Sequence, residues 1–138
     1  MYLLRELDWR RYKDSVMDNS VKRRIAYIAG SLAKTHSNLG SIYDYQDSQH
    51  YSMSGQISLS NISVFDYSTS SHFSGNGSGG RFSLFDYSTN SHIDFNYKMG
   101  SFDGFDYRTN THFNGSANAN GGVDLFDYST SKYYSYSV

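Results

Sequence analysis

Carboxylate and imidazole side chains recur at a regular spacing in the second part of this 138-residue chain. Each Asp lies between two aromatic residues, in Phe-Asp-Tyr or Tyr-Asp-Tyr, and a His follows six residues later in four of the five copies. Regularly spaced carboxylates could bind Ca²⁺, and imidazoles could bind Zn²⁺ or titrate near neutral pH. The recurring residues are Asp44, Asp66, Asp86, Asp106 and Asp127, with His50, His72, His92 and His112.

The five Asp residues fit a structural role better than a calcium site. No copy has the dense run of alternating acidic ligands that a calcium loop requires. Asp side chains readily accept hydrogen bonds from backbone N–H groups and hydroxyls of their own turns. We therefore expect each Asp to stabilise its turn, around Thr69, Thr89, Thr109 and Thr130.

The four His residues are expected to stack across a strand pair on the preceding Tyr. In a sheet of hairpins, equivalent residues lie two strands apart, roughly 10 Å, so neighbouring His could not share one zinc ion. In a β-solenoid they would stack every ~4.8 Å, and a metal ladder would become feasible. We favour the hairpins and expect neither a metal nor another cofactor.

A row of aromatic residues is the best candidate for a binding surface. Flat rings beside Ser, Asn and His could stack on sugar rings or nucleobases. Equally, aromatic pairs across strands stabilise sheets without a ligand, and an exposed apolar strip could be buried by a second copy of the protein. The candidate ligand or interface residues are Phe65, Tyr67, His72, Phe85, Tyr87, His92, Phe105, Tyr107, His112, Phe126 and Tyr128.

No set of residues predicts catalysis. The ten-residue segment around each repeated Asp, such as "SLFDYSTNSH" at 83–92, is called the repeated phrase below. The only His outside it is His36, and neither a Gly-x-Ser-x-Gly motif nor a phosphate-binding loop is present. The stretch "GNGSGG" at 75–80 has no Lys after it and is typical of a flexible turn. We expect no enzymatic activity.

The elements that must position these residues follow from the spacing of the phrase. Its first aromatic is Tyr43, Phe65, Phe85, Phe105 or Phe126, which gives spacings of 22, 20, 20 and 21 residues. A regular period of this length indicates a repeat architecture. Within residues 81–99, two runs of alternating apolar and polar residues flank "STNS", which predicts a β-hairpin with Tyr87 opposite His92 and Phe85 opposite Asp94.

The first 36 residues predict helix, as one long helix or as a pair that breaks near Asn19. Val21, Ile25, Ile28 and Leu32 form one helical stripe, and an earlier stripe begins at Leu3. We expect a single folding unit with a helical segment, 1–40, and a five-repeat β region, 41–138. The predicted fold is α+β: the helical segment packs on an antiparallel meander of about ten strands, which lies flat or curls around it. The alternative is a β-solenoid capped by the helix.

The distribution of charge along the chain limits the kinds of molecule that it is expected to bind. Residues 1–40 carry eight Lys or Arg and four Asp or Glu, whereas residues 41–138 carry four and nine. The basic cluster around 10–13 and 22–24 is interpreted as a solvated helix face attracted to the acidic sheet, so nucleic acid is an unlikely partner. We see neither a membrane span nor a signal peptide, which predicts a cytoplasmic protein, with leaderless release as the alternative.

The "YDY" and "FDY" tripeptides of 41–138 resemble the Tyr-Asp pair of the YD repeats in bacterial Rhs-type toxin shells. Those are also β-hairpin repeats of about this length. The Gly-Arg that follows the Asp in that family is missing here, so the resemblance assigns no site residue.

The function expected from the sequence is structural or interaction-based. The chain has no Pro, and its last segment, "YYSYSV", carries no charge to protect a strand edge. We therefore expect homo-oligomers that form through strand edges or through the aromatic face. The alternative is a small module that binds a carbohydrate or a similar polar ligand on the Phe/Tyr/His face.

Overall fold

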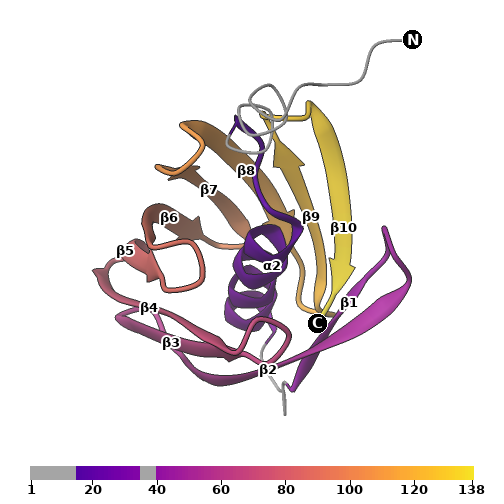
Figure 1. Ribbon diagram of the computed structural model, residues 1–138. Helices are drawn as coiled ribbons and strands as arrows, with labels where there is room; N and C mark the ends of the chain where they lie inside the picture. The colour runs from indigo at the N-terminus through magenta and orange to yellow at the C-terminus, as the bar shows by residue number, and fades with distance from the viewer. Residues whose placement is uncertain (1–14, 35–39) are drawn as a thin grey trace, which may run out of the picture.

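A computed structural model describes residues 15–34 and 40–138 of the chain. These residues form one α-helix, α2 (Asn19–Ala33), followed by ten β-strands in chain order (Figure 1). The strands are β1 (Ser41–Asp44), β2 (Gln49–Ile57), β3 (Asn61–Asp66), β4 (Ser71–Ser78), β5 (Arg81–Asp86), β6 (Ser91–Lys98), β7 (Ser101–Asp106), β8 (Thr111–Ala117), β9 (Gly122–Asp127) and β10 (Lys132–Ser137).

The ten strands form a closed antiparallel barrel in which each strand pairs with its neighbours in the chain and β1 pairs with β10. The expected antiparallel meander on a helix is confirmed. An open sheet and a β-solenoid are both wrong, because the meander closes on itself. Closure satisfies the outer backbone groups of the first and last strands, which an open sheet would leave unpaired.

Helix α2 lies inside the barrel, where Figure 1 shows the strands arranged around it. Its 15 residues span about 22 Å at 1.5 Å per residue, far less than a helix laid across an open sheet. Residues 16–18 are not helical, so a single helix over 1–36 is wrong, and the helix begins at Asn19, near the expected break. The earlier stripe around Leu3 falls outside the described residues.

The face of the sheet that the sequence predicted as the core face lies on the inside of the barrel. Val64, Phe73, Leu84, Ile93 and Phe95 are completely buried, in contact with the buried residues of the helix. Alternation along each strand accounts for this, since every second side chain points to the same face. The other residues predicted for this face are buried or partly buried: Ile62, Phe82, Phe102, Phe113, Val123, Leu125, Tyr134, Tyr136 and Val138.

The hairpin register differs from the prediction by two residues on the second strand, because the four-residue turn begins one residue earlier than expected. Phe85 pairs with His92, Asp86 pairs with Ser91, and the turn consists of residues 87–90. The predicted pairs of Tyr87 with His92 and of Phe85 with Asp94 are wrong, because Tyr87 belongs to the turn. The last turn residue, Asn90, has φ 54°, a left-handed conformation that Asn tolerates better than most residues.

Both ends of the helix are tied to the wall. At the mouth formed by the Asp-containing turns, the backbone N–H of Met17 donates to Ser129 Oγ over 3.2 Å. At the opposite end, Lys34 Nζ donates to the backbone oxygen of Val138 over 3.0 Å. Gly30 allows close packing there, since a Cβ on it would lie 2.5 Å from Val138 Cγ2. The helix therefore has a defined position along the barrel axis.

Candidate functional site

Each repeated Asp is the last residue of its strand, in β1, β3, β5, β7 or β9, and its side chain is buried, with exposed fractions of 0–4%. In each, Oδ1 accepts a hydrogen bond from the backbone N–H two residues later, at 2.8–3.0 Å. This is an Asx-type turn, and the expected role in stabilising the turn is confirmed. The donors are mostly not the Thr residues that the sequence suggested; only Thr109 donates its hydroxyl to an Asp side chain, Asp106 Oδ2, over 3.1 Å.

The second carboxylate oxygen of four of these Asp residues binds a cation on α2. Arg24 bridges two of them, with Nη1 at 2.7 Å from Asp66 Oδ2 and Nη2 at 2.7 Å from Asp86 Oδ2. Lys22 Nζ lies 3.1 Å from Asp127 Oδ2, and Arg23 Nη1 lies 3.2 Å from Asp44 Oδ2. The predicted solvated helix face is therefore wrong for residues 22–24, of which Lys22 and Arg24 are buried. Residues 10–13 lie outside the described part of the chain.

Helix geometry explains how three consecutive residues reach four strands. Successive side chains on an α-helix point about 100° apart, so positions 22, 23 and 24 fan out over more than half a circle. They reach, in order, the end of β9, the end of β1, and the ends of β3 and β5. These ends follow one another around the closed barrel. The sequence signal for this was the run of three cations beside an acidic repeat.

Asp106, at the end of β7, is the exception in this ring of carboxylates. Its side chain is 1% exposed and accepts hydrogen bonds from the Arg108 backbone N–H and the Thr109 hydroxyl. Within the described residues, no Lys or Arg forms an ion pair with it. Burial raises the pKa of Asp106, and the hydrogen bonds and the nearby Arg108 charge oppose that shift only in part.

The predicted binding residues lie on the outer wall of the barrel. In each phrase the first aromatic residue, a Phe or Tyr43, is half-buried. Its ring contacts the Tyr two residues later and, on the paired strand, a His or, in the fifth phrase, Tyr133. For the third phrase, the Phe85 ring centroid lies 4.7 Å from that of Tyr87 and 5.1 Å from that of His92. The expected stacking of His on the Tyr is wrong, because the register places the Phe opposite the His.

Equivalent ring sets occur on all five hairpins, and together we call them the aromatic rim. The turn tyrosines are half-exposed, at 50–57%, and the backbone N–H of Tyr87 donates to the His72 carbonyl of the preceding hairpin. Equivalent rings lie two strands apart, about 10 Å, so the candidate residues form a belt and do not converge on one point. Its members are Tyr43, Tyr45, His50; Phe65, Tyr67, His72; Phe85, Tyr87, His92; Phe105, Tyr107, His112; and Phe126, Tyr128, Tyr133.

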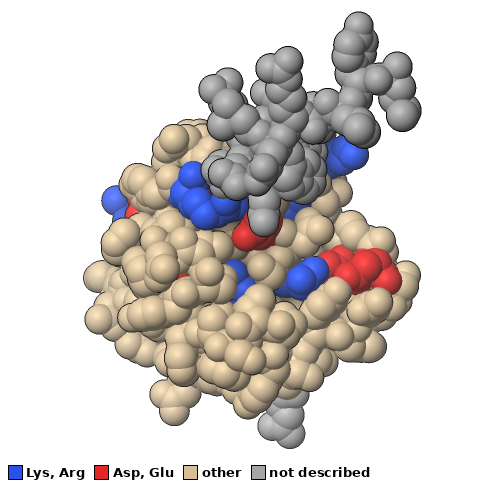
Figure 2. All heavy atoms as spheres, in the orientation of Figure 1, with Lys and Arg blue, Asp and Glu red and all other residues tan. Residues whose placement is uncertain are grey.

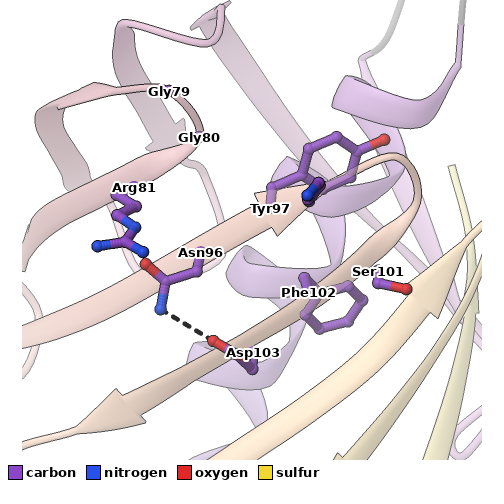
Figure 3. Close-up of a pocket in the computed structure, with 9 residues that line it drawn as sticks. Gly79, Gly80, Arg81, Asn96, Tyr97, Ser101, Phe102 and Asp103 are labelled. Atoms are coloured by element: carbon purple, nitrogen blue, oxygen red, sulfur yellow. Dashed lines mark hydrogen bonds between the residues drawn. The ribbon is translucent and has the colours of Figure 1, made fainter.

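Three adjoining hollows mark the outer wall from β5 to β10, and sequence reasoning missed them. They have volumes of about 610, 530 and 390 Å³, and Asp103 lines all three. Figure 3 shows the first, where Asn96 Nδ2 donates to Asp103 Oδ1 over 2.9 Å and Arg81 lies beside Asn96. The signal in the sequence was the difference between equivalent hairpins, since Asp94 and Asn114 stand where the second hairpin has Ser74.

The described residues contain no group of three or more His, Cys, Asp or Glu that could hold a metal ion. In the same part of the chain, no helix has the length and apolar character that crossing a membrane requires. The expected cytoplasmic location stays a prediction. Figure 2 shows charged side chains gathered around one mouth of the barrel, with much of the surrounding surface uncharged.

These features define a closed barrel with an apolar core, buried ion pairs at one end and an aromatic outer rim. No family model matches the chain, and neither a curated protein nor a solved structure matches it significantly.

Proposed function

We propose that this protein is a non-enzymatic structural or interaction protein that associates with copies of itself through the aromatic rim. The observation that carries the proposal is the set of five turn tyrosines with nearly equal exposed fractions, 50–57%, on the outer wall. Exposed apolar surface that is organised in this way is typical of interfaces. The Asp carboxylates of the repeated phrase stabilise turns and bind cations of the helix, which supports a role without catalysis.

Barrel closure favours the rim over the strand edges as the route of association. The edge of β10 that the sequence left unprotected pairs with β1, and Gln46 extends that pairing through its side chain. Its Oε1 accepts from the Ser135 N–H over 2.7 Å, and its Nε2 donates to the Ser135 carbonyl over 3.1 Å. A second copy would therefore have to displace bonds within the barrel to add a strand.

A second copy suits the rim because the rim is self-complementary. The rings repeat at about 10 Å, so the tyrosines of one copy can fit between those of another in a symmetric contact. The rings carry no formal charge apart from His protonation, and the whole chain has a net charge of −1. Like-charge repulsion between copies is therefore small.

A dilution series followed by NMR tests where copies meet. We expect the resonances of Tyr67, Tyr87 and Tyr107 to shift between micromolar and millimolar protein, because their rings leave water on association. Resonances of the buried wall residues Leu84 and Ile93 serve as the internal control. Concentration-independent spectra, or shifts confined to the seam between β1 and β10, would rule out the rim as the interface.

A second candidate function is the binding of a carbohydrate or a similar polar ligand. The specific observation in its favour is the hollow of about 530 Å³ between β6 and β8. Polar Asp94, Asp103 and Asn114 line it together with the rings of Phe105 and Tyr128. Sugar-binding surfaces need such a mixture, since rings cover the C–H faces of a sugar and polar groups bind its hydroxyls.

A further inference from the structure

We propose that the outer wall from β5 to β10 is a binding site for a neutral glycan chain, a proposal that rests on the second candidate function above. The site is the surface around Asp103 where the three hollows meet, and we call it the Asp103 groove. Its polar lining includes Asn96, Asp103, Asn114 and Asp124, with Asp94 at the edge nearest the rim. The first hollow also has the cations Arg81 and Lys98 in its lining. Its rings are Phe105, His112, Tyr128 and Tyr133.

The groove lies where the repeats stop being alike. The ring positions are similar in all hairpins, but the outward positions next to them are not. Ser83 of β5 is replaced by Asp103 in β7 and by Asp124 in β9, and Ser74 of β4 is replaced by Asp94 in β6 and Asn114 in β8. The fold does not require carboxylates there, because the Ser-lined part of the same wall forms equivalent strand pairs. Larger polar side chains on one side of the barrel are therefore available for binding.

The polar groups of the groove are held in place by neighbours. Asn96 donates to Asp103 over 2.9 Å, and Asn114 donates to the hydroxyl of Tyr128 over 2.9 Å. The hydroxyl of Tyr107 donates to Asp94 over 2.7 Å, which raises the pKa of Tyr107. Groups that are already oriented lose less conformational entropy when a ligand binds. Each carboxylate and amide keeps further acceptor capacity for ligand hydroxyls.

The chemistry of the lining selects a neutral polyhydroxylated chain. The carboxylates of Asp94, Asp103 and Asp124 accept hydrogen bonds from hydroxyls and repel anionic groups such as uronates or phosphates. They outnumber the two cations of the lining, Arg81 and Lys98, which belong to the first hollow only. A metal ion is a poor fit, since the described residues offer no group of three ligands. Adjoining hollows that share Asp103 form an elongated surface, which suits several linked sugar rings better than one small molecule.

An immobilised array of neutral and uronic-acid glycans, probed with the full chain, tests the groove. We expect binding to neutral oligosaccharides and at least about a tenfold weaker signal for Asp103→Ala and Asn114→Ala, each of which removes a polar contact. Ser83→Ala and Ser74→Ala are the matched controls, because they change the equivalent positions of β5 and β4 and neither residue lines the hollows. They should bind as the wild type does.

A further variant distinguishes glycan binding in the groove from self-association through the rim. The double variant Tyr67→Ser/Tyr87→Ser should keep glycan binding even if it loses self-association, since neither residue lines the hollows. The proposal that the groove binds a neutral glycan is wrong if no neutral glycan binds, if only uronates bind, or if the control variants lose as much signal as Asp103→Ala. Thermal unfolding of each variant verifies that it is folded before it is placed on the array.

Discussion

At the scale of single residues, the Asp of the repeated phrase has two separate roles. One oxygen stabilises the turn in which the Asp lies, and in four copies the other oxygen binds a cation of the helix. The first role could be predicted from the sequence, since Asx turns are local. The second could not, because it depends on where Lys22, Arg23 and Arg24 lie relative to residues up to about a hundred positions away.

Asp86→Asn should lower stability and Asp106→Asn should not, although they change equivalent positions. Asp86→Asn removes a charge from the buried Arg24 pair and should lower the free energy of unfolding by about 3 kcal/mol. Asp106→Asn removes a buried carboxylate that has no ion pair among residues 15–34 and 40–138, so the free energy of unfolding at pH 7 should stay the same or rise. Urea unfolding measures both, and equal losses in the two variants would contradict this assignment.

The pH dependence of Asp106 provides a second prediction at this scale. Its pKa is raised above the usual 3.8 by burial, so the folded state holds the proton more tightly than the unfolded state. Stability from this proton is complete below the unfolded pKa and is lost as pH rises through the folded pKa. The stability of Asp106→Asn relative to wild type should therefore increase as pH rises above 4. A difference that does not change with pH, in urea titrations from pH 3.5 to 7.5, would show that Asp106 has an ordinary pKa.

At the scale of elements, the hairpins were largely predictable and their register was not. Alternation from Phe82 to Asp86 predicted which face is buried, and that face is buried. The register depends on where the turn begins, and the Asx bond of Asp86 starts it one residue before the "STNS" stretch. In the helix, the stripe of Val21, Ile25 and Ile28 predicted one buried face, whereas the barrel buries nearly the whole circumference.

The turn between β6 and β7 predicts a stabilising substitution. Met99 has φ 51°, Gly100 has φ 89°, and the Met99 side chain is 92% exposed. The turn between β4 and β5 has the same signs of φ at Gly79 and Gly80. Left-handed backbone costs a residue such as Met about 1 kcal/mol, and Asn-Gly is the favoured pair for a two-residue hairpin turn.

Met99→Asn should therefore raise the midpoint of thermal unfolding, by an amount that corresponds to roughly 0.5–1 kcal/mol. Met99→Leu is the matched control, because Leu gains nothing in a left-handed conformation and should leave the midpoint unchanged. Differential scanning calorimetry measures both variants. A Met99→Asn midpoint at or below that of Met99→Leu would show that the turn is not strained at this position.

At the scale of the whole molecule, closure of the barrel decides what each surface can do. The residue pattern of a strand is the same in an open meander and in a closed barrel, so the local sequence did not distinguish them. What closes the sheet is the pairing of the four-residue β1 with β10, a contact between the two ends of the strand series. Closure encloses the helix with its three cations and leaves the aromatic rim on the surface that faces water.

Sedimentation velocity from about one to one hundred micromolar protein is the most direct test of self-association through the rim. The wild type should form concentration-dependent oligomers, because burial of a few half-exposed tyrosines contributes several kcal/mol of apolar transfer free energy. Tyr67→Ser/Tyr87→Ser should sediment as a monomer throughout this range and unfold at nearly the wild-type temperature. A wild type that is monomeric at tens of micromolar, or a double variant that still associates as the wild type does, would contradict the proposal.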